Sequence, residues 1–193
     1  MKSWIGAGIF TLFLSGVANA ALITADFRTE SNLPGIGAGL PLVYESLNQS
    51  IGAGFELDNS HFIENPSSWG GGVVWLDFDP TTNILTLDSQ DNWDFRTFDA
   101  WLSNIIFSEV GEVISGITML TNNLVDVALD PILSFSDNSI HISYNYMPNT
   151  FNFTGGTATF QIQTSLNTTP VPAPASFGLL ALGLLGLRLR KRN

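Results

Sequence analysis

The stretch that decides the fold class is VVWLDFDPTTNILTL, residues 73–87. Apolar residues alternate with other residues both before and after the middle of this stretch. Before the middle they are Val74, Leu76 and Phe78. This two-residue period is typical of a strand with one buried face. Asp79-Pro80-Thr81-Thr82 places proline second in a turn, where its fixed φ is favoured. The stretch therefore predicts a β-hairpin.

Four further strands are predicted downstream, at residues 114–120, 132–135, 139–146 and 157–164. Residues 139–146 show the pattern most clearly, because apolar and polar side chains separate onto two faces. One face carries Ile140, Ile142, Tyr144 and Tyr146, and the other carries Ser139, His141, Ser143 and Asn145. Residues 98–107 fit either a strand or one face of a helix, and we predict a strand there.

Short strands separated by Gly, Pro, Asn and Asp clusters, with no long helical periodicity, predict an all-β fold. Since no crossover helices connect the strands, we expect a single antiparallel β-sandwich, jelly-roll-like, over residues 21–165. The glycine-rich residues 35–39 are expected to form a turn. A dinucleotide-binding loop would need glycine where Leu40 stands, and Pro41 opposes the helix that should follow.

The first twenty residues have the features of a secretion signal. Lys2 gives a basic start, residues 5–17 are apolar, and Ala18-Asn19-Ala20 is the small-x-small pattern that signal peptidase accepts. As a helix, the apolar run would reach only about 20 Å, against about 30 Å for the hydrocarbon core of a bilayer. We therefore predict a signal peptide with a signal helix at residues 1–20, and a mature N-terminus at Ala21.

The C-terminal segment changes composition abruptly. Residues 166–176 form a linker rich in Thr and Pro around Val171-Pro172-Ala173-Pro174, and the prolines favour an extended chain. Residues 177–193 are predicted to form a short apolar helix with a basic stop tail. The basic residues are Arg188, Arg190, Lys191 and Arg192. They should stay on the cytoplasmic side of the inner membrane and stop translocation. A permanent anchor is the alternative, although the apolar run is short for a stable span.

This order of proline motif, short apolar helix and basic stop resembles the PEP-CTERM sorting signal of Gram-negative bacteria that make extracellular polysaccharide. Ala173 stands where the family name has glutamate. The resemblance implies that an exosortase-like sorting enzyme cuts near Val171, Pro172, Ala173 and Pro174. It also implies an inner-membrane-anchored precursor and a mature form on the cell surface or outside the cell.

Between the terminal signals, residues 21–170 hold seventeen acidic and only two basic residues, a net charge of −15. Such a field repels phosphate backbones, so nucleic acid is excluded as a partner. The chain has no cysteine, which excludes disulfides, thiolate zinc sites and a cysteine nucleophile. The domain must therefore be stabilised by its hydrophobic core.

An acidic stretch supplies the candidate metal site, with Asp77, Asp79, Asp88, Asp91 and Asp94. Asp77 and Asp79 lie two apart on one strand face, about 7 Å between Cα atoms. That spacing lets two carboxylates share a calcium ion or flank a glycosidic bond. The pattern is not an EF-hand loop, however, and solvated carboxylates are usual in an acidic protein. We predict no cofactor, with calcium as the alternative.

Aromatic and histidine residues offer two other candidate sites. Exposed tryptophans on one face could stack on sugar rings, although most tryptophans of a sandwich lie in the core. The candidates are Trp69, Trp75, Trp93 and Trp101. No serine lies in a nucleophile elbow, so no catalytic triad is predicted. We expect His141 to face solvent and His61 to lie in a strand or loop.

Together these features predict a non-enzymatic, exosortase-sorted surface or matrix protein associated with exopolysaccharide or adhesion. The alternatives are a calcium-dependent carbohydrate-binding module and a carbohydrate-active enzyme. Predicted partners are signal peptidase, the sorting enzyme, the inner membrane and polysaccharide. Carboxylates that converge in a cleft would favour the enzyme, whereas scattered acids on a smooth sandwich would favour the matrix role.

Overall fold

The computed structural model describes residues 21–37, 39–66, 68 and 70–167. The predicted signal helix, most of the proline-rich linker and the apolar helix with its basic tail lie outside these residues. Within them the only helix is the 3-10 turn η1 (Asn59–His61). No helix among the described residues is both long and apolar enough to cross a membrane.

The described residues form antiparallel sheets, which confirms the all-β prediction. The larger sheet has six strands, in the order β3 (Phe62–Glu64), β2 (Leu42–Ser50), β1 (Leu22–Asn32), β7 (Thr97–Phe107), β10 (Ser139–Asn145) and β9 (Ile132–Ser136). The smaller sheet has four, in the order β4 (Val74–Asp79), β5 (Ile84–Ser89), β12 (Thr157–Leu166) and β8 (Glu112–Asn122). A short pair, β6 (Asp94–Phe95) and β11 (Phe151–Asn152), lies at one end.

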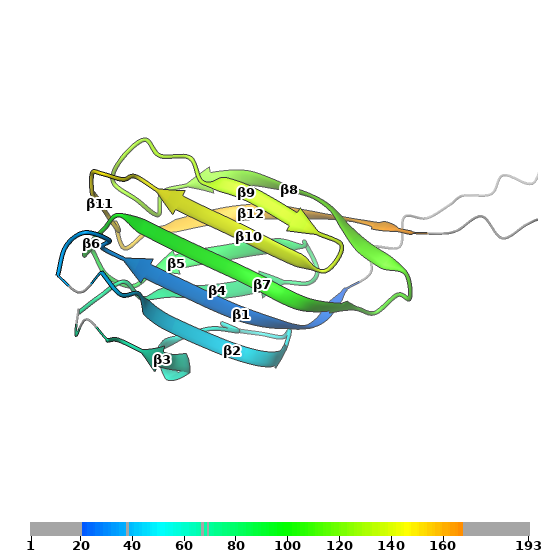
Figure 1. Cartoon of the computed structure of the whole chain (residues 1–193). Helices are drawn as coiled ribbons and strands as arrows, with labels where there is room; N and C mark the ends of the chain where they lie inside the picture. The colour runs from blue at the N-terminus through cyan, green and yellow to red at the C-terminus, as the bar shows by residue number, and fades with distance from the viewer. Residues whose placement is uncertain (1–20, 38, 67, 69, 168–193) are drawn as a thin grey trace, which may run out of the picture.

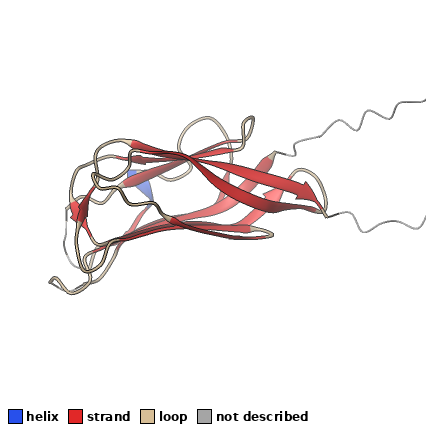
Figure 2. Cartoon of the chain, turned by 90° about the horizontal axis from the view of Figure 1, so that it is seen from above, coloured by secondary structure: helices blue, strands red, loops and turns tan. Residues whose placement is uncertain are grey.

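The two larger sheets lie face to face, as the views from the front and from above show (Figures 1 and 2). They share one hydrophobic core, which takes Phe27 and Phe98 from the larger sheet and Leu76 and Phe160 from the smaller. Each of these four side chains is at most 1% exposed. Because side chains alternate across a strand, the residues between them point outward, and each sheet has an outer face.

The hairpin predicted from residues 73–87 is present as β4 and β5, with Leu76 opposite Leu87 and the turn at residues 80–83. The strands predicted at residues 114–120, 132–135, 139–146 and 157–164 correspond to β8, β9, β10 and β12. Residues 98–107 are strand β7, so that choice is also confirmed. In β10, Ile140, Ile142 and Tyr144 are buried as predicted, while Tyr146 lies just beyond the strand and is half-buried.

Strands β1 and β2 were not predicted, although β1 occupies the middle of the larger sheet. The inward side of β1 carries Phe27 but also Thr29 and Ser31, which are each 1% exposed. Ser31 is satisfied there because its hydroxyl donates to the carbonyl of Gly72, at 2.8 Å. A strand with polar inward residues lacks the hydrophobic alternation from which strands are predicted.

Both ends of the described chain are fastened to the connection between β7 and β8, at one end of the molecule (Figure 1). The N–H of Ala21 donates to the Ser108 hydroxyl at 3.1 Å, and the N–H of Ser108 donates to the Ala21 carbonyl at 2.9 Å. The N–H of Asn167 donates to the Gly111 carbonyl at 2.7 Å. Ala21 and Asn167, the two ends of the described chain, therefore lie at the same end of the domain.

Candidate functional site

The outer side of the four-stranded sheet forms what we call the Trp75 face, made of the outward side chains of β4, β5, β12 and β8. One row crosses all four strands, because Asp77 is opposite Thr86, Thr86 is opposite Thr159, and Thr159 is opposite Thr121. A neighbouring row runs from Trp75 through Asp88 to Thr157. The face therefore combines an aromatic ring with carboxylates and hydroxyls.

Trp75 is half-buried on this face, and two neighbours fix its ring. Its indole N–H donates to Oδ1 of Asn59 at 2.8 Å. The ring of Phe55 meets it edge-to-face, with 4.7 Å between centroids and 63° between planes. The ring is thus held in one orientation without a ligand.

The segment that carries Phe55 and Asn59 is attached to β4 by a buried acid. Glu56 is 1% exposed, and its carboxylate accepts the N–H of Phe78 at 2.8 Å and the N–H of Gly52 at 3.1 Å. Burial raises the pKa of Glu56, and these two hydrogen bonds oppose the rise. Its bonds to strand and loop give Glu56 a structural role, which its position in the sequence did not suggest.

Threonine and glutamine occupy most of the remainder of the Trp75 face. Thr121 and Thr159 share a hydrogen bond at 2.7 Å, and Gln161 Nε2 donates to the carbonyls of Thr82 and Asn83. Gln163 lies across Gly116, where an added Cβ would come within 2.3 Å of its Oε1. The alternation in residues 157–164 places these polar side chains on one face, but this surface was not recognised as a site from the sequence.

Asp77 and Asp79, the predicted calcium pair, both point outward from β4. Burial and then the charge of Asp79 raise the pKa of Asp77. The carboxylate of Asp79 is hydrogen-bonded within the turn. It accepts the N–H of Thr81 at 2.8 Å and the hydroxyl of Thr82 at 2.7 Å. These two hydrogen bonds lower the pKa of Asp79. The two carboxylates thus have different local partners.

The other acids of the stretch do not gather around this pair. Asp88 is on β5 opposite Trp75, whereas Asp91 lies in a loop and accepts the N–H groups of Val73 and Trp93. Asp94 is on β6, which pairs with β11 rather than with β4 or β5. Among the residues that the structure describes, no group of three or more His, Asp or Glu side chains could hold a metal ion.

The outer side of the six-stranded sheet, the Trp101 face, is built from charged pairs. Arg28 on β1 donates to the carboxylate of Glu30 through Nε at 3.0 Å and also through Nη2. Its Nη1 donates to Glu45 on β2 at 3.1 Å. One guanidinium thus balances two neighbouring acids, and all three side chains are partly buried.

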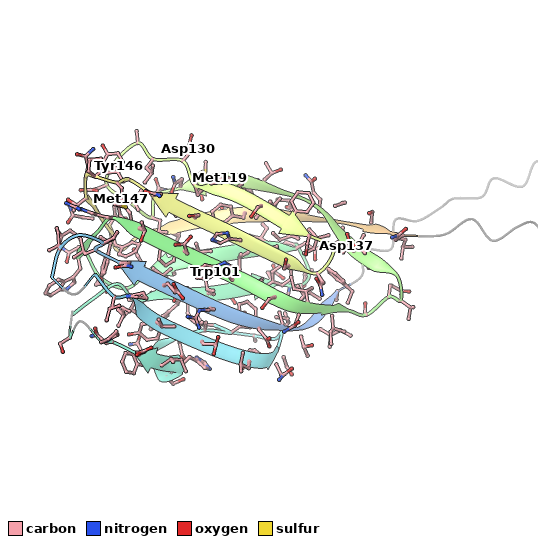
Figure 3. The ribbon with its side chains drawn as sticks, in the orientation of Figure 1. Trp101, Met119, Asp130, Asp137, Tyr146 and Met147 are labelled. Carbon is pink, nitrogen blue, oxygen red and sulfur yellow. The ribbon has the colours of Figure 1, made fainter. Side chains whose placement is uncertain are left out.

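His141 and Trp101 form the aromatic part of the Trp101 face, where Figure 3 labels Trp101 on β7. The two rings are stacked, with 4.8 Å between centroids and 6° between planes. His141 Nε2 is also 2.8 Å from Oδ1 of Asp99. His141 faces outward as predicted, but it is half-buried and engaged with two neighbours instead of being simply solvated.

The described tryptophans lie neither together nor in the core. Trp75 and Trp101 occupy opposite outer faces, and Trp93 is 53% exposed in the loop before β6, over Gly70 and Gly71. Trp69 lies outside the described residues. The expectation that most tryptophans would be core residues is therefore wrong for these three, and no face shows several of them side by side.

His61 ends the 3-10 turn η1 and is bound locally. The N–H of Asp58 donates to its Nδ1 at 3.1 Å, while the Asp58 carboxylate accepts the N–H of Ser60 at 2.8 Å. This reciprocal cap explains the histidine by local structure, although His61 ends a 3-10 turn instead of lying in the predicted strand or loop.

The C-terminal tail matches the family model of the PEP-CTERM protein-sorting motif over residues 170–192. This confirms the resemblance inferred from the proline motif, apolar run and basic stop. The matched range contains the predicted processing residues from Val171 to Pro174 and the basic residues from Arg188 to Arg192, all of which lie outside the described residues. No curated protein and no solved structure matches the chain.

The motif marks the chain as an exported protein that exosortase sorts from a membrane-anchored precursor. The motif Ala18-Asn19-Ala20, which is predicted to precede the cleaved bond, lies outside the described residues. Ala21 is the first described residue, directly before β1.

Proposed function

We propose that this protein is a non-catalytic component of the cell surface or extracellular matrix, delivered by exosortase and associated with exopolysaccharide. The observation that carries the proposal is the sorting motif at residues 170–192. In this proposal the two facing sheets form a single jelly-roll-like sandwich over residues 21–165, presented outside the cell after the tail is cut.

The distribution of the acids supports a binding role over a hydrolytic one. Hydrolysis of a glycosidic bond uses two carboxyl groups on either side of one bond. Here Asp79 and Asp91 are committed to turns and loops, and Asp94 belongs to a different strand pair. Asp77 and Asp88 remain on the Trp75 face, beside an aromatic ring. That juxtaposition favours a carbohydrate-binding module as the second candidate, and calcium is not required for it.

The sorting part of the proposal is tested by the intact mass of the mature protein that cells of its native host release into the medium. We expect a product that begins at Ala21 and lacks residues 188–193. Replacing Arg188, Arg190, Lys191 and Arg192 together with glutamine should reduce retention of the precursor at the inner membrane. Thr168→Ser with Thr169→Ser, in the same tail, is the matched control. A secreted product that still contains residues 188–193 would contradict the proposal and favour a plain anchor.

The matrix part is tested separately, by sedimentation of the exopolysaccharide from the same cultures. We expect the mature protein to sediment with the polysaccharide and to stay in the supernatant when the host cannot make it. A protein that stays soluble in both cultures would contradict the association while leaving the sorting result intact.

A further inference from the structure

We propose that the Trp75 face binds an uncharged polysaccharide chain, with Trp75 stacking on a sugar ring and the row Asp77, Thr86, Thr159 and Thr121 hydrogen-bonding its hydroxyls. This inference rests on the proposed association with polysaccharide and adds the chemical class of the glycan and the surface that binds it.

The charge of the described domain selects an uncharged glycan. Its two basic residues are both away from the Trp75 face. Arg28 is on the outer side of β1, paired with two glutamates, and Arg96 donates through Nη1 to the carbonyl of Pro34 at 2.9 Å. The acids Asp77 and Asp88 therefore have no cation beside them on the face. An anionic polysaccharide would be repelled, whereas hydroxyl groups can donate to these carboxylates.

Trp75 provides a ring that is already oriented before a ligand arrives. Asn59 holds its N–H and Phe55 meets its ring edge-to-face. An aromatic ring offers a large apolar surface at a low cost in conformational entropy, and this cost is lower still when the ring is fixed. The apolar side of a sugar ring is the matching surface, and the carboxylates of Asp77 and Asp88 on the same face can accept hydrogen bonds from its hydroxyls.

The row of hydroxyls gives the site an extended shape. Asp77, Thr86, Thr159 and Thr121 lie on four adjacent strands, so the row spans roughly 14 Å at the spacing of strands in a sheet. The hydrogen bond between Thr121 and Thr159 uses one donor, and each hydroxyl can accept two hydrogen bonds. The row therefore has hydrogen-bonding capacity that the protein itself leaves open.

The Trp101 face does not offer the same capacity. Arg28 is bound to Glu30 and Glu45, and His141 is bound to Asp99 and stacked on Trp101. A ligand there would have to replace contacts that the protein already makes, and would lose their energy. Trp101 thus supplies a matched control, since it is also a half-buried tryptophan but lies on the opposite face.

The test is affinity electrophoresis of the mature protein secreted by its native host, in native gels containing one polysaccharide each. The probes are galactomannan and hydroxyethylcellulose, which are uncharged, and alginate, which is anionic. We expect retardation by at least one uncharged polymer and none by alginate. Retardation by alginate alone would overturn the inference.

Variants locate the site. Trp75→Ala should weaken the retardation about tenfold, as loss of an aromatic anchor does elsewhere, while Trp101→Ala should leave it unchanged. Thr86→Val with Thr121→Val and Thr159→Val keeps the side-chain volume and β-propensity while removing three hydroxyls. Because each hydrogen bond contributes about 1 kcal/mol, this variant should also bind at least about tenfold more weakly. Melting temperatures of all three proteins check that each is folded.

The outcomes separate this inference from the function on which it rests. If the wild type is retarded and Trp101→Ala, but not Trp75→Ala, abolishes retardation, the face is wrong and the association with polysaccharide stands. If neither substitution changes retardation, the Trp75 face is likewise excluded. If the mature protein sediments with its native exopolysaccharide but no uncharged polymer retards it, the inference about the glycan fails while the matrix role survives.

Discussion

The two outer faces of the domain differ in how their polar side chains are hydrogen-bonded. Both lie on antiparallel sheets over one core, and each carries one half-buried tryptophan. On the Trp101 face the polar side chains are paired with one another across strands, as with Arg28 and Glu45 or His141 and Asp99. On the Trp75 face they are chiefly threonines and glutamines with few mutual bonds.

This difference shows where each face directs its hydrogen bonds. Cross-strand ion pairs stabilise a sheet modestly and leave few groups for a ligand. Unpaired hydroxyls contribute little to the fold, because water satisfies them equally well in the absence of a ligand. The Trp101 face is therefore expected to contribute more to stability, and the Trp75 face more to binding.

The largest expected effect is on the free energy of unfolding, and it tests whether β12 has one buried side and one outer side. Phe160 is buried in the core and Thr159, its neighbour, is on the Trp75 face. Phe160→Ala should lower the free energy of unfolding by about 3–5 kcal/mol through lost burial and the cavity that remains. Thr159→Ala should cost only about 1 kcal/mol. Urea unfolding measures both, and similar losses would contradict the assignment of faces.

A smaller effect separates the two faces by their dependence on salt. Arg28→Met removes a charge that balances Glu30 and Glu45, and should cost about 1 kcal/mol at low ionic strength. The cost should shrink in about 1 M salt, where charges are screened within about 3 Å. Thr118→Ala, on the Trp75 face, is the control and should respond little to salt. Equal responses of both variants would remove the distinction.

Asp77, one of the acids of the Trp75 face, should make the stability of the protein depend on pH. Burial and then Asp79 raise the pKa of Asp77, so its ionised form costs stability at neutral pH. This cost disappears as the pH falls below the pKa of an unfolded aspartate, about 3.9. Asp77→Asn should therefore stabilise the protein at pH 7, by well under about 1 kcal/mol because the group is only partly buried. A gain that grew at acidic pH would have the wrong sign.

The smallest expected effect concerns calcium. Because the carboxylate of Asp79 is engaged with Thr81 and Thr82, we expect calcium, magnesium and sodium at matched ionic strength to raise the melting temperature equally. A calcium-specific rise that Asp77→Asn with Asp79→Asn abolishes would instead establish a site. At a hundred times its dissociation constant, a bound ion would add about 2.7 kcal/mol.

The sequence predicts the strands whose burial alternates cleanly. The hairpin of β4 and β5, strand β10 and the ambiguous residues 98–107 were all predicted because large apolar side chains mark their inner faces. Strands β1 and β2 were not, since the inner side of β1 includes Thr29 and Ser31. The burial of the Ser31 hydroxyl depends on its hydrogen bond to Gly72, distant in sequence, and no local pattern reveals such a contact.

The candidate site was only partly predictable for a related reason. The sequence shows Asp77, Asp79 and Trp75 close together, and the structure places them on one strand face. The sequence predicts the turn that begins at Asp79, but it does not show that the Asp79 carboxylate is engaged by that turn, or that Thr86, Thr159 and Thr121 align in one row. Such alignment depends on the order and register of strands, which form between segments far apart in the chain.

Strand β12 determines how the domain responds to a pulling force. It leads directly to the tail and lies between β5 and β8, bonded to both. Tension applied at Asn167 would act along this strand and load the hydrogen bonds on its two sides together, instead of opening them one at a time. A protein held in a matrix by its C-terminal end would therefore resist shear where its tether begins.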